Sequence, residues 1–117
     1  MSWTAREDAA EAAASILLSD GAYQGPVTVT AEHAPTFEEI AATASELTGH
    51  TTRRELMDPE DWAAAQTAAG TPQFMARFLL GFYRAADAGY FSGTDPLLGK
   101  LIGRTPQGIR NFLTQTD

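Results

Sequence analysis

Pairs of a helix-capping residue and a proline recur through the second half of the chain and limit what that half can fold into. Asp and Thr accept hydrogen bonds at helix N-termini, and proline is favoured at the first helical position. The pairs are Asp58-Pro59, Thr71-Pro72, Asp95-Pro96 and Thr105-Pro106. They predict helices over residues 59–69, 72–88, 95–102 and 106–114.

Two capping boxes predict further helices in the first half of the chain. Thr4 precedes Glu7 by three residues, and Thr36 precedes Glu39 by the same interval. In this motif the two side chains satisfy backbone N–H groups reciprocally. The first helix is expected to end near residues 20–21, and the second to close at Gly49 in the left-handed conformation.

Two segments between these helices are expected to be strands. Residues 27–30 are β-branched and follow the turn signal Gly25-Pro26, and residues 51–57 have weaker support. A strand–helix–strand order predicts a right-handed βαβ unit with parallel strands. The expected fold class is therefore α/β and helix-rich, with a small parallel βαβ unit and about six helices. The length of 117 residues is typical of one domain, spanning 1–117.

Composition and charge exclude several classes of protein. The chain has no cysteine, which excludes disulfides, thiolate nucleophiles and cysteine zinc sites. A net charge of -7 argues against nucleic-acid or membrane partners, because both favour basic surfaces. No apolar run approaches the roughly 20 residues of a membrane span, and the N-terminus does not resemble a signal peptide. A cytoplasmic location is expected.

Motifs for nucleotide chemistry are absent from the sequence. The glycines never form G-x-G-x-x-G after a strand, and Gly99-Lys100 is followed by leucine, which excludes a P-loop. Lys100 is the only lysine and has Pro96 four positions before it, so the Tyr-x-x-x-Lys pair of short-chain reductases cannot exist. His33 and His50 are isolated and predict no metal site. We therefore expect no catalytic, cofactor-binding or metal-binding residue in this chain.

The helix expected over residues 72–88 has an unusually wide apolar surface. A helix that packs only against a core needs a narrower stripe. This helix therefore lies between two layers, lines a pocket for a flat ligand or makes a subunit contact. Its large apolar residues are Phe74, Met75, Phe78, Leu79, Leu80, Phe82 and Tyr83.

The order of several short motifs resembles one family along essentially the whole chain. The family is the NmrA-like atypical short-chain dehydrogenases, and the likeness is greatest to their zinc-free NAD(P)H:quinone oxidoreductases. The motifs are Arg6-Glu7-Asp8-Ala9-Ala10-Glu11, Gly25-Pro26-Val27-Thr28-Val29-Thr30, Thr36-Phe37-Glu38-Glu39-Ile40-Ala41, Asp58-Pro59-Glu60-Asp61-Trp62, Ala69-Gly70-Thr71-Pro72 and Gly103-Arg104-Thr105-Pro106. One departure is residues 32–36, where the family usually has Gly-Pro-x-x-Leu-Thr.

This resemblance implies the C-terminal, substrate-binding lobe of such a reductase without its Rossmann domain. On that reading Phe74, Phe78, Phe82 and Tyr83 line a cleft for a planar apolar ligand such as a quinone. NADPH is implied for the full-length family but not for this chain alone, so the detached lobe would be inactive. It would need a separate cofactor-binding subunit or form a homodimer. The alternative is a free-standing small-molecule-binding or protein-interaction module without catalysis.

Overall fold

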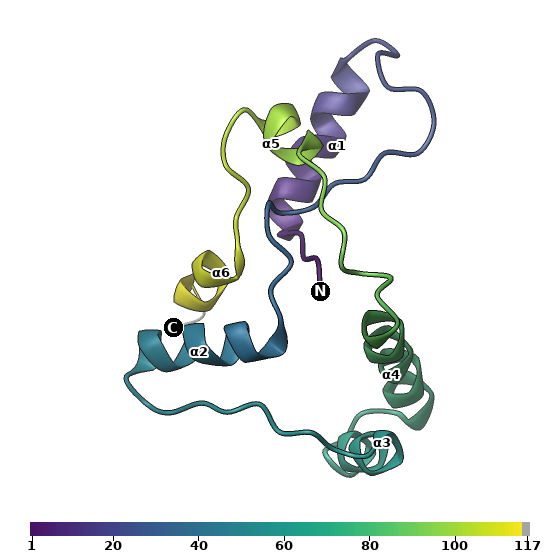
Figure 1. Cartoon of the computed structure of the whole chain (residues 1–117). Helices are drawn as coiled ribbons and strands as arrows, with labels where there is room; N and C mark the ends of the chain where they lie inside the picture. Colours follow the sequence, from purple (N-terminus) through teal and green to yellow (C-terminus); the bar gives the residue numbers. More distant parts are fainter. Residues whose placement is uncertain (116–117) are drawn as a thin grey trace. The chain divides into compact units, whose positions relative to one another are not determined.

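A computed structural model of the chain describes residues 1–115, and these residues contain six helices (Figure 1). Their bounds are α1 Arg6–Leu18, α2 Phe37–Thr48, α3 Pro59–Ala68, α4 Gln73–Asp87, α5 Leu97–Ile102 and α6 Ile109–Gln115. The chain divides into two compact units. Unit 1 comprises Met1–Arg53 and the segment from Ser92 onward, and unit 2 comprises Arg54–Phe91.

Unit 1 is organised by α1 against α5 and by α2 against α6. Ala12 of α1 and Leu98 of α5 are buried, and the Ser15 hydroxyl donates a hydrogen bond of 2.8 Å to the Leu101 carbonyl. Glu46 of α2 and Arg110 of α6 form an exposed ion pair.

The expected parallel βαβ unit is wrong, because residues 27–30 and 51–57 form no strand within the described range of 1–115. Residues 27–30 and the following Ala31 instead make isolated hydrogen bonds to the N-terminal segment. The Thr4 hydroxyl donates to the Val29 carbonyl at 2.8 Å, and the Ala31 N–H donates to the Trp3 carbonyl at 2.9 Å. β-branched residues favour an extended backbone, but a strand also requires a ladder of hydrogen bonds to a neighbouring strand.

Predicted helix caps were confirmed where the capping side chain bonds to a backbone N–H group two or three residues further along. The Thr36–Glu39 box is present in both directions, and Gly49 closes α2 with a φ of 71°. The Asp58 carboxylate accepts hydrogen bonds from the Glu60 and Asp61 N–H groups at the start of α3. Asp95 also accepts from the Leu97 N–H at 2.8 Å, but it is not the predicted N-cap, because Pro96 is the N-cap and α5 begins at Leu97.

Three other helix starts differ from the prediction. The Thr4 hydroxyl bonds to Val29, so α1 begins at Arg6 without a side-chain cap. Pro72 is the N-cap of α4, which also lacks a side-chain cap. After Thr105 the chain is irregular, with the buried Pro106 beside Gly99, and α6 begins only at Ile109. At Thr4 a nonlocal hydrogen bond replaces the expected cap, and at Pro106 a nonlocal contact accompanies the later helix start.

Candidate functional site

Unit 2 is a pair of helices in which α3 packs against α4. Its core consists of Ala63, Ala76 and Leu80, and Trp62 packs against them half-buried. Alanines at the contact allow the two helices to approach closely, and only one side of α4 is used in this way. Phe74 and Phe78 of α4 are mostly exposed and therefore lie outside this core.

Three phenylalanines form a line along the exposed side of α4, which we call the phenylalanine ladder. Phe74, Phe78 and Phe82 are spaced by four residues, and their exposed fractions are 71%, 62% and 41%. The rings of Phe78 and Phe82 meet edge to face with centroids 5.2 Å apart. The Phe82 ring also stacks on Phe91 at 6.1 Å. Such pairs hold the rings in defined orientations.

Tyr83, the fourth residue predicted to line the cleft, lies apart from the ladder. Its ring meets Trp62 of α3 edge to face at a centroid distance of 5.2 Å and an interplanar angle of 71°. One residue along a helix is a rotation of about 100°, which turns Tyr83 from the ladder toward α3. The four predicted residues thus fall into two groups, the ladder and a Trp62–Tyr83 pair.

A shallow hollow of about 450 Å³ lies on the α3–α4 pair but does not include any of these four residues. Its lining is Glu60, Ala63, Ala64, Thr67, Ala68, Gln73 and Arg77. The Glu60 carboxylate lies 3.2 Å from Arg77 and 3.8 Å from Arg84, and all three side chains are exposed. These ion pairs connect charged groups of α4 to α3.

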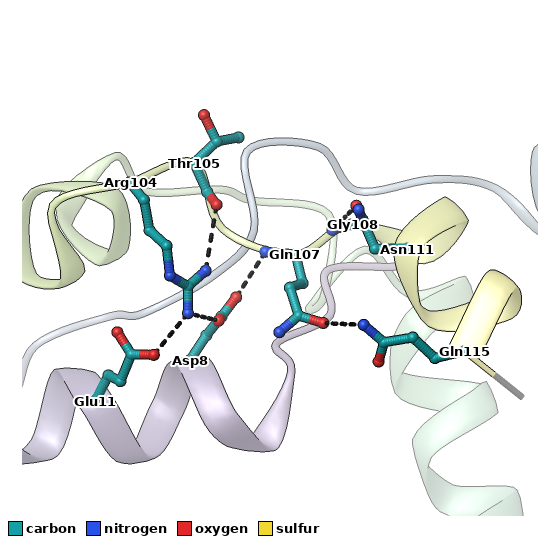
Figure 2. Close-up of polar contacts among 8 residues, drawn as sticks. All are labelled: Asp8, Glu11, Arg104, Thr105, Gln107, Gly108, Asn111 and Gln115. Atoms are coloured by element: carbon teal, nitrogen blue, oxygen red, sulfur yellow. Dashed lines mark hydrogen bonds and ion pairs between the residues drawn. The ribbon is translucent and has the colours of Figure 1, made fainter.

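Unit 1 contains a polar cluster around a buried carboxylate that the sequence did not predict (Figure 2). Asp8 of α1 is fully buried. Its Oδ1 accepts a hydrogen bond from Nη2 of Arg104 at 2.6 Å, and its Oδ2 accepts one from the Gln107 N–H at 2.6 Å. Arg104 also donates to Glu11 at 2.8 Å. The hydrogen bonds that Arg104 donates to Glu11, and then to Asp8, raise the pKa of its guanidinium.

The burial of Asp8 has no clear signal in the sequence. Asp8, Glu11 and Ser15 form a polar stripe, which is typical of a solvated face. The structure instead packs this stripe against α5 and the loop that follows it. Ala12, also on this side, is the one hint, because a small residue permits close packing. Nothing local connects Asp8 to Arg104.

The histidines and acids of residues 1–115 decide whether this part of the chain could hold a metal ion. His33 and His50 are both exposed. Within residues 1–115, no group of three His, Asp or Glu side chains is placed to hold a metal ion. No helix in that range combines the length and apolar character needed to cross a membrane.

The N-termini of α1, α2 and α3 carry acids, which disfavour a bound pyrophosphate. A pyrophosphate is normally held at a helix start after a glycine-rich turn, where backbone N–H groups and the helix dipole attract negative charge. Here the first turns of three helices carry acids: Glu7 and Asp8, Glu38 and Glu39, and Glu60 and Asp61. These carboxylates would repel phosphate and, in α2 and α3, the N–H groups already have side-chain partners.

The fold of this chain is similar to part of several solved structures. Neither a protein-family model nor a curated protein sequence matches the chain. Among solved structures, the Citrobacter sp. triphenylmethane reductase complexed with NADP(H) matches all of this chain at 26% identity and a TM-score of 0.91. The NADPH-dependent quinone oxidoreductase of Escherichia coli matches 96% of it at 23% identity and a TM-score of 0.83. A Staphylococcus aureus nucleoside-diphosphate-sugar epimerase matches 97% at 20% identity and 0.84.

The chain has the fold of the C-terminal lobe of NmrA-like reductases, which confirms the resemblance inferred from the sequence motifs. It spans about 41% of the quinone oxidoreductase and of the triphenylmethane reductase. Both of these proteins are described with a nicotinamide cofactor, NADPH or NADP(H). The helices that carry the ladder and the Asp8 cluster both belong to the matched part, because the match to the triphenylmethane reductase covers the whole chain.

Proposed function

We propose that this chain is the substrate-binding lobe of an NADPH-dependent reductase that acts on quinones or similar planar aromatic compounds. The observation that supports it most is the match of the whole chain to a triphenylmethane reductase complexed with NADP(H). A quinone oxidoreductase has the same fold in this region. NADPH-dependent chemistry also fits the cytoplasmic location expected from the sequence.

In this proposal the phenylalanine ladder forms the apolar wall of the substrate site. Phe74, Phe78 and Phe82 extend over about 12 Å of helix, the length of a fused-ring or multi-ring compound. Their exposed faces can stack on or meet the edges of a flat ligand, and burying them removes apolar surface from water. Tyr83, held against Trp62, would contribute a hydroxyl near one end of the ladder.

The reducing cofactor would be held by another domain. The acids at the starts of α1, α2 and α3 disfavour a pyrophosphate, and the sequence has neither the glycine-rich loop nor the Tyr-x-x-x-Lys pair. The residues of this chain would therefore bind and orient the substrate and exclude water from it. The cofactor-binding domain would supply the chemistry, and the lobe alone would be inactive.

Titration of NADPH and of 1,4-naphthoquinone into the purified chain tests this proposal. A Trp3→Phe background leaves Trp62 as the only indole, and its ring contacts Tyr83 of the helix that carries the proposed wall. Naphthoquinone is expected to quench its fluorescence saturably, whereas NADPH produces no binding signal and is not oxidised. Tight NADPH binding together with quinone turnover by these 117 residues alone would contradict the proposal.

A matched pair of variants locates the binding surface. Phe78→Ser is expected to weaken naphthoquinone binding about tenfold, because a buried aromatic contact of this kind contributes about 1.4 kcal/mol. Phe112→Ser in α6 removes a ring of similar exposure, 58%, from unit 1 and is expected to leave binding unchanged. Equal effects of both substitutions would show that the ladder is not the binding wall.

A second candidate function is ligand capture without catalysis. The absence of a nucleotide loop and of a catalytic pair from the sequence favours it. Both functions predict quinone binding, so only turnover separates them. Addition of a cofactor-binding domain that restores naphthoquinone reduction would favour the reductase, and saturable binding that never leads to reduction would favour capture.

A further inference from the structure

We propose that the phenylalanine ladder is also a self-association surface, on which α4 of one copy packs antiparallel against α4 of a second copy. Phe78 would lie on the two-fold axis of this dimer. The inference does not depend on the proposed reductase function, because it concerns pairing of the chain in the absence of any ligand.

The exposed side of α4 is apolar over a broad sector. At about 100° per residue, Phe74, Phe78, Phe82, Met75 and Leu79 fall within a sector of about 140°. The other positions in this sector are Ala85 and Ala86, so it contains no charged side chain. All five large residues have exposed fractions of 36% or more. A contiguous apolar surface of this kind on a soluble protein usually marks a contact site.

The spacing of the ladder is symmetric about Phe78, which is what a two-fold contact requires. An isologous interface uses the same patch on both subunits, so each residue faces its symmetry mate. With Phe78 on the axis, Phe74 of each copy faces Phe82 of the other, because both lie four residues from the centre. Three aromatic contacts would form at once. The antiparallel orientation also places opposite ends of the two helix dipoles side by side.

Gly81 leaves one edge of this surface open to a second helix. It lies inside α4, where glycine is unfavourable for a helix, and nothing beyond its chain neighbours and the helix backbone lies within 4 Å of the position that a Cβ would occupy. At about 100° per residue, Gly81 lies about 60° from Phe78, just outside the apolar sector. The missing side chain therefore allows a second helix to approach closely beside Phe78.

The available area is sufficient for a modest dimer. Since a buried aromatic side chain covers 150–250 Å², the exposed parts of the five large residues offer about 500 Å² per copy. Two copies would then bury about 1,000 Å², the lower limit for a specific interface. Each copy carries a net charge of -7, and this repulsion is expected to weaken at higher salt. Pairing should therefore strengthen as the ionic strength rises.

Sedimentation or light scattering over a range of concentrations tests this inference without ligand. The wild-type chain is expected to show a reversible monomer–dimer equilibrium. Phe78→Glu places two carboxylates on the axis and should weaken association at least about 30-fold, the size of an interface hot spot. Gly81→Gln should also weaken it while improving the helix propensity of α4, so loss of folding would not account for the result.

A charge-complementation experiment identifies the axis itself. Phe78→Glu and Phe78→Lys should each be monomeric alone, whereas an equimolar mixture should recover the dimer, because opposite charges then meet across the two-fold axis. Leu18→Glu changes an 85% exposed residue in α1 and should leave association unchanged. A chain that stays monomeric at every concentration, or a dimer that Phe78→Glu does not weaken, would overturn the inference. Either result would leave the quinone-binding proposal standing.

Discussion

The carboxylate of Asp8 and the guanidinium of Arg104 lie 2.6 Å apart, although 96 positions separate them in the sequence (Figure 2). Together with the Gln107 N–H they connect α1 to the loop between α5 and α6. The Asp8 carboxylate is shielded from water, whereas the Arg104 side chain is 40% exposed. This contact therefore ties the first helix to the last part of unit 1.

Asp8→Ala is expected to destabilise unit 1 by about 3 kcal/mol, because it removes a buried acceptor and leaves the Gln107 N–H without its partner. Glu11→Ala removes the exposed contact to the same arginine and should cost less than about 1 kcal/mol. Urea denaturation of the two variants measures the difference. Similar losses of stability in the two variants would show that the buried Asp8 carboxylate contributes no more than the exposed Glu11 carboxylate.

Thr36→Ala is expected to cost about 1 kcal/mol, because the Thr36 hydroxyl accepts the Glu39 N–H at the start of α2. Thr36→Ser keeps the hydroxyl and should retain most of the stability. Denaturation monitored by circular dichroism gives both values. A serine variant as unstable as the alanine variant would show that the methyl group, rather than the cap, matters.

Two glycine substitutions should act in opposite directions. Gly49 closes α2 with a φ of 71°, so Gly49→Ala is expected to destabilise the chain by about 1 kcal/mol. Gly81 lies inside α4 with open space around it, so Gly81→Ala should stabilise that helix by up to about 1 kcal/mol. Thermal unfolding below the concentration at which the chain self-associates compares them. The same sign for both changes would contradict this account.

Glu60→Gln should have little effect on stability, although Glu60 contacts both Arg77 and Arg84. Exposed pairs contribute between zero and about 1 kcal/mol, and salt screens them. Stability measured at low and at high salt should show a small difference that disappears as salt is added. A large loss that persists at high salt would mean that the carboxylate is stabilised in some other way.

Ligand binding and self-association should compete, because both proposals use Phe78. Addition of 1,4-naphthoquinone is expected to shift the light-scattering mass of the wild-type chain from dimer toward monomer. The Phe112→Ser variant, which keeps the ladder, should respond in the same way. If naphthoquinone quenches Trp62 fluorescence while the dimer mass stays unchanged, the quinone binds outside the α4 pairing surface.

Predictions from the sequence succeeded where the interaction is local. The capping box of Thr36 and Glu39 joins groups three residues apart, and Gly49 adopts its conformation because of its own missing side chain. All six expected helices exist, and the start that differs most is that of α6, which begins at Ile109 rather than at residue 106. The order of short motifs was sufficient to identify the family fold, which the structural comparison confirmed.

The sequence by itself determined the helices, their caps and the apolar surface of α4, because each follows from residues within about one or two turns of one another. Tertiary structure decided the rest. It left residues 27–30 without a strand partner, since a ladder depends on a second segment that propensity does not specify. It also buried Asp8 through contacts with Arg104 and Gln107, and it turned Tyr83 toward Trp62. Each of these outcomes depends on contacts between residues that are far apart in the sequence.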